Sequence, residues 1–461
     1  MAAAVLWLCC GGAGALEGTA PGTAASTGTR TASSTPGAIA PVLPPSQGMA
    51  QAEISAELIQ RGQYVARAAD CIACHSAPGG PPYAGGLRMN TPFGALFTTN
   101  ITPHPTQGIG QYSFEDFENA VRRGIRKDGG RLYPAMPYPS FSGITPQDMQ
   151  ALYAYFMLGV EPQPVANRDN LLPWPFSMRS LLRLWTAVFY RERPFVEDPA
   201  RDASWNRGAY LVRVLGHCGA CHTPRGLAGQ EKAMSEADGP RYLSGAVLDD
   251  WYAPNLPKTL KASAFPWSVD DLVEFLETGR NQRNASVGPM VDVIGHSTQY
   301  LSEADRRAIA DYLLSLPVNE RGEARPPADA EAAVAATAQR LRDLDVSLPG
   351  ARLYLDNCQA CHRADGAGDP RTFPALAGSA VVLGREPNSL VAMILRGSAM
   401  PSTRRAPSAL SMPGFGWRLS DDEIAELATF LRSSWGNAAG SVSASQVKGL
   451  RERFETHGAN R

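Results

Sequence analysis

The sequence contains no uninterrupted apolar segment of about 20 residues, the length that a membrane-spanning helix requires. Neither sign of charge is in excess, because 43 lysines and arginines stand against 44 aspartates and glutamates. A cofactor-binding signature such as Gly-x-Gly-x-x-Gly is also missing. We therefore expect neither a bundle of transmembrane helices nor a basic surface for nucleic acid, and we see no sign of a flavin or quinone site.

Cysteine is scarce, and most of it lies in one motif. Six of the eight cysteines belong to three copies of Cys-x-x-Cys-His, which are Cys71-Cys74-His75, Cys218-Cys221-His222 and Cys358-Cys361-His362. Only Cys9 and Cys10 lie outside the motifs. The chain therefore has no spare cysteines for a framework of disulfides.

The spacing of the motifs helps to decide among a zinc site, a redox dithiol and a haem c site. A zinc ribbon needs a second ligand pair within a few tens of residues, whereas these motifs begin at residues 71, 218 and 358. A thioredoxin-type dithiol lies in a βαβ unit, but no β-branched strand runs flank these motifs. A histidine directly after each pair is typical of haem c, which takes two thioether bonds and a proximal imidazole. We predict three covalently bound haem c groups.

An internal repeat surrounds the motifs. The segments "RGQYVARAADCIACH" and "RGAYLVRVLGHCGACH" share Arg-Gly-x-Tyr, and the third, "GARLYLDNCQACH", keeps a Gly and a Tyr at another spacing. Each repeat ends with a predicted helix that has Ser or Thr as its N-terminal capping residue: "ITPQDMQALYAYFM", "LSEADRRAIADYLLSL" and "LSDDEIAELATFLRSSW". A Gly in the first helix of a repeat lets the last helix of the same repeat approach closely. We expect an all-α chain of three tandem class I cytochrome c domains joined by linkers.

The expected domain organisation follows these repeats. It comprises a signal peptide and disordered linker (1–50), cytochrome c domain 1 (51–160), a linker with an amphipathic helix (161–204), domain 2 (205–317), a linker (318–348), domain 3 (349–437) and a C-terminal tail (438–461). The N-terminal apolar run ends in small residues, with Ala13-Gly14-Ala15 as a cleavage site, but no Lys or Arg precedes it.

Two amphipathic segments lie outside the haem repeats. In the first linker, Leu181, Leu184, Trp185 and Val188 share one helical face. We favour packing of this face between domains 1 and 2 over docking to another subunit or to a membrane. The tail "SASQVKGLRERFETHGANR" is expected to be a short basic helix that serves either as an anchor or as a cap on domain 3.

Each haem iron needs a sixth ligand, for which a loop methionine is expected. Met136, Met290 and Met412 each adjoin a proline and precede a closing helix. The alternative is that they are core-filling methionines. His296 is a rival to Met290, and Met400 is a rival to Met412. We predict the iron ligand pairs His75 with Met136, His222 with Met290, and His362 with Met412.

Three segments carry a family resemblance. They are "TTNITPHPTQGIGQYSFEDFENAVRRGIRKDGGRLYPAMPYPSF", "WNRGAYLVRVLGHCGACHTPRG" and "MPGFGWRLSDDEIAELATFLRSSWGN". Together they resemble the triheme cytochrome c subunit of bacterial membrane-associated dehydrogenases, such as alcohol and gluconate 2-dehydrogenases, from about Glu53 to Asn437. The resemblance implies that the chain takes electrons from a separate dehydrogenase subunit of quinoprotein, flavoprotein or molybdenum type.

The same resemblance implies an electron acceptor and a location. The acceptor would be ubiquinone or a terminal oxidase, and the chain would lie in the periplasm at the outer face of the cytoplasmic membrane, with peripheral membrane contact. We expect no catalytic residues and no activity of the chain alone. The alternative is a multihaem enzyme of peroxidase type with an open haem site, which three candidate methionines for three haems disfavour.

Overall fold

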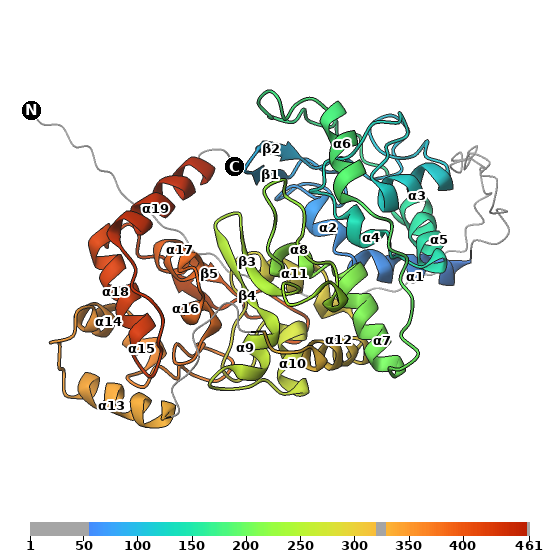
Figure 1. Cartoon of the computed structure of the whole chain (residues 1–461). Helices are drawn as coiled ribbons and strands as arrows, with labels where there is room; N and C mark the ends of the chain where they lie inside the picture. Colours follow the sequence, from blue (N-terminus) through green and yellow to red (C-terminus); the bar gives the residue numbers. More distant parts are fainter. Residues whose placement is uncertain (1–54, 320–328, 459–461) are drawn as a thin grey trace, which may run out of the picture. The chain divides into compact units, whose positions relative to one another are not determined.

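The computed structural model describes residues 55–319 and 329–458 (Figure 1). The predicted signal peptide (1–50), its cleavage site, and Cys9 and Cys10 lie outside the described residues. Helices predominate, but the described chain also holds three two-stranded antiparallel hairpins, so the all-α expectation is incomplete. No helix within these ranges is long and apolar enough to cross a membrane.

The first helix pair consists of α1 (Ala56–Ala68) and α5 (Pro146–Ala154), which lie side by side in Figure 1. The side chain of Thr145 caps α5 by accepting from the backbone N–H of Asp148, as the sequence predicts. A Cβ at Gly62 would lie 1.9 Å from the carbonyl oxygen of Ala151. The predicted close approach of the two helices is therefore confirmed here.

The second helix pair repeats the first. It consists of α7 (Ala203–Tyr210) and α12 (Glu303–Ser315). The side chain of Ser302 caps α12 by accepting from the N–H of Asp305. A Cβ at Gly208 would lie 1.9 Å from the carbonyl oxygen of Ala308, so this crossing also requires glycine.

The third helix pair, α14 (Ala351–Asn357) and α18 (Asp421–Ser433), differs in its crossing point. Its glycine, Gly350, is the N-cap of α14 with φ 83° and not a residue inside the helix. A Cβ there would lie 2.6 Å from Cβ of Phe430. Ser420 and Glu423 form a capping box at the start of α18. The different glycine spacing in the sequence thus corresponds to a different helix contact.

The remaining elements connect these pairs. Short helices at the motifs are α2 (Cys71–Cys74), α8 (Gly219–His222) and α15 (Gln359–His362). The hairpins are β1 (Arg88–Thr91) with β2 (Gly94–Phe97), β3 (Ser244–Leu248) with β4 (Trp251–Asn255), and β5 (Gly397–Ala399) with β6 (Ser411–Pro413). The other helices are α3 (Phe114–Arg123), α4 (Tyr138–Phe141), α6 (Ser180–Phe189), α9 (Leu256–Ala262), α10 (Val269–Thr278), α11 (Met290–His296), α13 (Ala330–Arg342), α16 (Ala380–Leu383), α17 (Asn388–Arg396) and α19 (Ala444–Gly458). Short π and 3-10 turns are η2 (Tyr155–Gly159), η3 (Leu211–Leu215), η4 (Glu236–Asp238) and η5 (Thr298–Tyr300).

Buried apolar residues form two clusters in the described chain. The first runs continuously through both the first and the second helix pairs, from Val65 to Leu316. The second belongs to the third pair and includes Tyr354, Ile424 and Trp435. The first two repeats therefore share one core, and the third repeat has its own.

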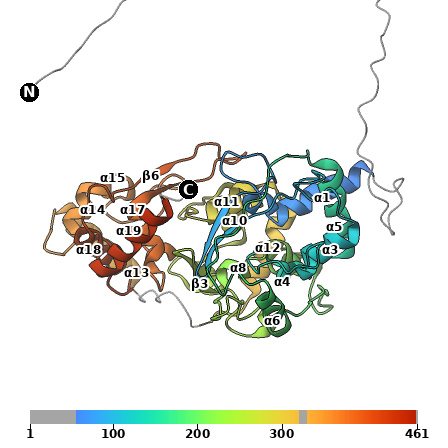
Figure 2. The same cartoon turned by 90° about the horizontal axis from the view of Figure 1, so that it is seen from above.

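The two amphipathic segments have different environments. The expectation that α6 packs between the first two repeats is met by Trp185, whose ring lies 6.3 Å from that of Tyr138, whereas Leu184 and Val188 are exposed, at 63% and 54%. The Nε1 of Trp185 also donates to the carbonyl of Ala228, in the second repeat, at 2.8 Å. In contrast, Val447 and Leu450 of α19 are buried, and α19 lies beside α18 (Figure 2). The tail helix is therefore a cap on the third pair.

Candidate haem-binding sites

The three motif histidines have the same hydrogen bond. In each, the ring Nδ1 lies against a backbone carbonyl oxygen: His75 at 2.7 Å from Thr99, His222 at 2.8 Å from Pro254, and His362 at 2.9 Å from Pro374. A carbonyl can only accept, so Nδ1 carries the proton and donates it. Nε2 of each ring therefore keeps its lone pair, which is the arrangement of a metal-binding imidazole.

Burial affects the charge of these rings. Desolvation lowers the pKa of His75, His222 and His362, although the hydrogen bond to the carbonyl opposes it in each case. The imidazoles are therefore neutral at pH 7. A neutral ring with a fixed tautomer can donate its Nε2 lone pair to iron without first losing a proton.

The motif cysteines are unpaired thiols. Burial raises the pKa of Cys71, Cys74, Cys218 and Cys358 to about 12, and it also raises the pKa of Cys221. Within the described residues, no group of three or more His, Cys, Asp or Glu side chains could hold a metal ion. Paired neutral thiols beside one imidazole fit thioether attachment of haem c and do not fit a zinc ribbon.

Two arginines near these motifs have buried donors without a partner in the described chain. They are Nη1 of Arg88, on β1, and Nε of Arg225, three residues after His222. A buried donor without an acceptor is costly, so these groups call for an anionic or carbonyl partner. The propionate carboxylates of a haem supply such acceptors, and the residues present therefore fit this group.

The sequence did not reveal which carbonyls orient the histidines. Thr99 follows β2 and Pro254 lies in β4, so a hairpin supplies the acceptor in both of the first two sites. A signal was present, because each acceptor is followed by a buried asparagine, Asn100 or Asn255. The Nδ2 of Asn100 donates to the carbonyl of Val165 at 2.9 Å, which holds the strand end in place.

The first two candidate methionines lie at the edge of the shared core. Met136 and Met290 are partly buried and pack against the core that the first two helix pairs share. Met290 is the first residue of α11 and His296 is the last. These two residues are separated by about 9 Å along the helix axis, so they cannot both serve one coordination position. The carbonyl of His296 accepts from Nη1 of Arg67 at 3.4 Å.

The third site has two candidate methionines with different surroundings. Met412 lies in β6 and pairs with Ser398 of β5. Sδ of Met400 lies 3.8 Å from Nη1 of Arg280, which donates to it. The sulfur of Met400 is thus already engaged by an arginine, and this favours Met412 as the residue with a free thioether.

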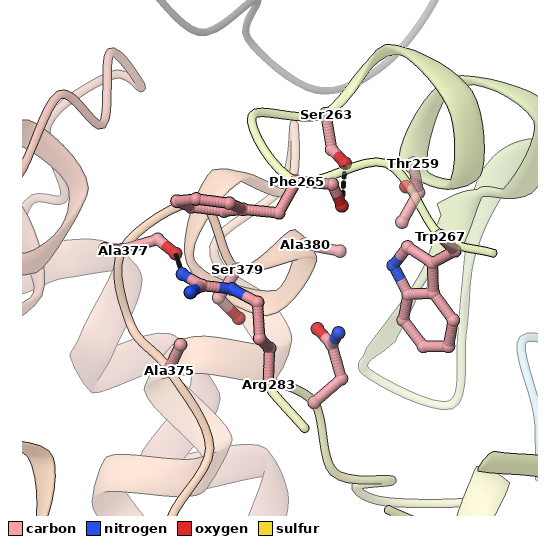
Figure 3. Close-up of a pocket in the computed structure, with 11 residues that line it drawn as sticks. Thr259, Ser263, Phe265, Trp267, Arg283, Ala375, Ala377, Ser379 and Ala380 are labelled. Carbon is pink, nitrogen blue, oxygen red and sulfur yellow. Dashed lines mark hydrogen bonds between the residues drawn. The ribbon is translucent and has the colours of Figure 1, made fainter. Parts of the chain in front are cut away.

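A small pocket lies beside residues 375–380, which follow the carbonyl of Pro374 that His362 contacts (Figure 3). Arg283 crosses it, with its guanidinium 3.4 Å from the ring centroid of Phe265 and its Nη2 donating to Ala377 at 3.4 Å. The carbonyl of Arg283 accepts from the N–H of Ala375, next to Pro374. The pocket has a free volume of about 10 Å³, which holds at most one water, so it is too small for a substrate.

Comparison with known proteins places the chain in a family. The cytochrome c family model matches residues 59–158 and 347–435, which contain the first and third motifs. The cytochrome c subunit of alcohol dehydrogenase (quinone) from Gluconacetobacter polyoxogenes is 48% identical over 399 residues, covering 86% of this chain and 84% of that protein. The chain belongs to the cytochrome c subunits of bacterial dehydrogenases. This cytochrome c subunit therefore has covalent haem c as its cofactor and electron transfer as its class of activity.

Other relatives of this cytochrome c subunit serve different dehydrogenases. The gluconate 2-dehydrogenase cytochrome c subunit of Pantoea cypripedii is 46% identical, with 87% of this chain and 92% of that protein covered. The fructose dehydrogenase cytochrome subunit of Gluconobacter japonicus is 39% identical, with 85% and 82% covered. The family resemblance that the sequence motifs carry is thus confirmed over most of the chain.

Proposed function

We propose that this cytochrome c subunit carries three haems and passes electrons from a partner dehydrogenase subunit to ubiquinone or a terminal respiratory acceptor. The observation that carries the proposal is the threefold repeat of a motif histidine whose Nδ1 donates to a backbone carbonyl. The proposed haem sites are Cys71, Cys74 and His75 with Met136, Cys218, Cys221 and His222 with Met290, and Cys358, Cys361 and His362 with Met412.

The residues of the chain have defined roles in this function. A bound haem supplies one-electron chemistry, because its iron alternates between the ferric and ferrous states. The carbonyls of Thr99, Pro254 and Pro374 fix the tautomer and direction of each imidazole. A methionine thioether favours ferrous iron relative to a second histidine, so Met136, Met290 and Met412 suit a carrier of high potential.

The relatives support the proposed dehydrogenase partner. These include cytochrome subunits of dehydrogenases for alcohols, gluconate and fructose, so we propose a dehydrogenase partner whose own catalytic subunit sets the substrate. We place the chain in the periplasm, at the outer face of the cytoplasmic membrane. The three proposed cytochrome c domains span residues 51–160, 205–317 and 349–437, each with one haem motif.

Haem counting tests the proposal. The chain is expressed with periplasmic haem maturation, denatured and weighed by mass spectrometry, and we expect the mass of three haems beyond that of the processed polypeptide. Replacing both cysteines of one motif, as in Cys218→Ala with Cys221→Ala, removes one haem, whereas replacing Cys9 and Cys10 removes none. A fully matured chain with two or fewer haems contradicts the triheme assignment.

A further inference from the structure

One surface segment is unusually apolar. Of the large hydrophobic side chains that are exposed in the described residues, eight lie between residues 171 and 189: Leu171, Trp174, Phe176, Met178, Leu181, Leu184, Val188 and Phe189. Trp174 is the most exposed of them, at 79%. Apolar patches of this density on a protein surface mark contact with another protein or with a membrane.

The segment is held firmly against the rest of the chain. Leu171 forms a β-bridge with Ala95, with N–O distances of 3.0 Å and 2.8 Å in the two directions. The ring of Phe176 lies 4.9 Å from that of Phe93. On the other side of α6, Trp185 donates to the carbonyl of Ala228, next to the fully exposed Leu227. The apolar side chains are therefore presented outward on a fixed support, and Leu227 extends the patch.

All charges within the segment are positive. Residues 171–191 contain three arginines, Arg179, Arg183 and Arg191, and no aspartate or glutamate. Arg179 donates to the carbonyl of Arg131, and Arg191 donates to the carbonyls of Ala187 and Tyr190. In the part of the chain that the structure describes, no carboxylate forms an ion pair with any of the three. Their positive charge is therefore available to an external anion.

We propose that residues 171–189 and Leu227 form a docking face for a bilayer that contains anionic phospholipids. The exposed Trp174 and the apolar face of α6 suit the boundary between headgroups and acyl chains, and the arginines suit phosphate groups. The charge of the segment is complementary to an anionic surface, because residues 171–191 carry three arginines and no carboxylate side chain. The proposal rests on the proposed function only in placing the chain beside a membrane.

Vesicle sedimentation tests this face directly. The full haem-loaded chain is mixed with vesicles of phosphatidylglycerol and phosphatidylcholine, or of phosphatidylcholine alone, and the bound fraction is measured. We expect binding to the anionic vesicles that weakens as salt rises. Leu184→Glu with Val188→Glu lowers the partition coefficient more than tenfold, and Arg179→Gln with Arg183→Gln lowers it by roughly fivefold per arginine.

A matched control separates the patch from general surface hydrophobicity. Leu344 is 69% exposed but belongs to the segment before the third helix pair, so Leu344→Glu leaves vesicle binding unchanged. Each variant must keep its haem absorption and unfolding temperature. Vesicle binding that is absent, or that persists in Leu184→Glu with Val188→Glu, overturns the proposal. If those substitutions instead release the dehydrogenase subunit while vesicle binding persists, the face belongs to the protein partner.

This experiment is independent of electron transfer. Haem content and reduction by a soluble reductant are measured on the same variants and are expected to match the wild type. Failure of vesicle binding with intact haems rejects the membrane face alone. A chain that lacks three haems but still binds anionic vesicles rejects the triheme function alone.

Discussion

The hydroxyl of Tyr210 donates to Oδ2 of Asp148 at 2.7 Å, although the two residues belong to different helix pairs. Oδ1 of the same carboxylate accepts from Nε of Arg61, on the helix that crosses its own, at 2.8 Å. The second pair repeats this arrangement, with Tyr64 donating to Asp305 at 2.6 Å. Each closing helix thus binds an arginine from its own pair and a tyrosine from the other.

This reciprocal contact accounts for the Arg-Gly-x-Tyr repeat. In the second copy, Arg207 pairs with Asp305, Gly208 permits the helix crossing, and Tyr210 reaches the other repeat. The third repeat lacks the pattern, and its Tyr354 donates to the carbonyl of Arg363 within the same repeat. The motif is therefore present where two repeats share a core and absent where the core is separate.

Removing either tyrosine hydroxyl should weaken the shared core. Tyr64→Phe and Tyr210→Phe each leave a largely buried carboxylate oxygen with one donor fewer, which lowers the free energy of unfolding by about 1–2 kcal/mol. Denaturant titration of the haem-loaded chain measures this loss. Tyr133→Phe, which removes a more exposed hydrogen bond of 3.3 Å, serves as the control and should change stability by less than about 0.5 kcal/mol. Equal effects at all three positions would contradict the prediction.

Asp305 should make stability depend on acidic pH. Burial alone raises its pKa, but the hydrogen bonds from Arg207 and Tyr64 outweigh burial and hold the pKa below its ordinary value. Such a carboxyl stabilises the fold above its unfolded pKa of about 4, and this contribution is lost as the pH falls through the lower folded pKa.

The variant Asp305→Asn tests this dependence. We expect it to be less stable than the wild type at pH 7 and to lose less stability than the wild type below about pH 4. Unfolding titrations at neutral and acidic pH measure the difference. Parallel pH curves for the two proteins would show that Asp305 does not contribute in this way.

The crossing glycines should not tolerate a methyl group. Gly62→Ala or Gly208→Ala places Cβ against a backbone carbonyl, so we expect a loss of about 3 kcal/mol or more in the free energy of unfolding. At Gly440 an added Cβ meets nothing within 4 Å, and Gly440→Ala is the matched control. Thermal unfolding of the three variants distinguishes them, and a stable Gly208→Ala would mean that the helices cross elsewhere.

The sixth ligand of the third haem should be Met412 and not Met400. Met412→Ala is expected to lower the reduction potential of one haem and to remove its methionine-to-iron absorption band. Met400→Ala leaves both unchanged, because its sulfur contacts Arg280. Redox titration followed by absorption spectroscopy measures these effects. The reverse pattern in the two variants transfers the ligand role to Met400.

The purified chain should depend on a partner for substrate oxidation. We expect it to accept electrons from a soluble reductant but to show no turnover with alcohols, aldehydes or sugar acids. Its ferric spectrum should be low-spin if a methionine ligates each iron, as we propose. Steady substrate oxidation by the chain alone, or a high-spin haem that reacts rapidly with peroxide, would favour the multihaem enzyme instead.

Local sequence signals determined much of this protein. The capping residues Thr145 and Ser302 and the crossing glycines of the first two helix pairs are found where the pattern places them. These features depend on neighbours within a few residues, or on one helix face, and they repeat along the chain. A cap, a motif turn and a helical stripe can therefore be recognised without knowing the rest of the fold.

Only the tertiary structure decided the contacts between distant residues. It showed that Thr99 and Pro254 orient two of the histidines, that Tyr210 and Asp148 join the first two repeats in one core, and that Leu184 faces outward. A hydrophobic helical stripe has the same sequence whether it is buried or exposed, and a backbone carbonyl carries no sequence signal. Which surfaces meet depends on how helices far apart in the chain pack together, and that packing is a property of the whole fold.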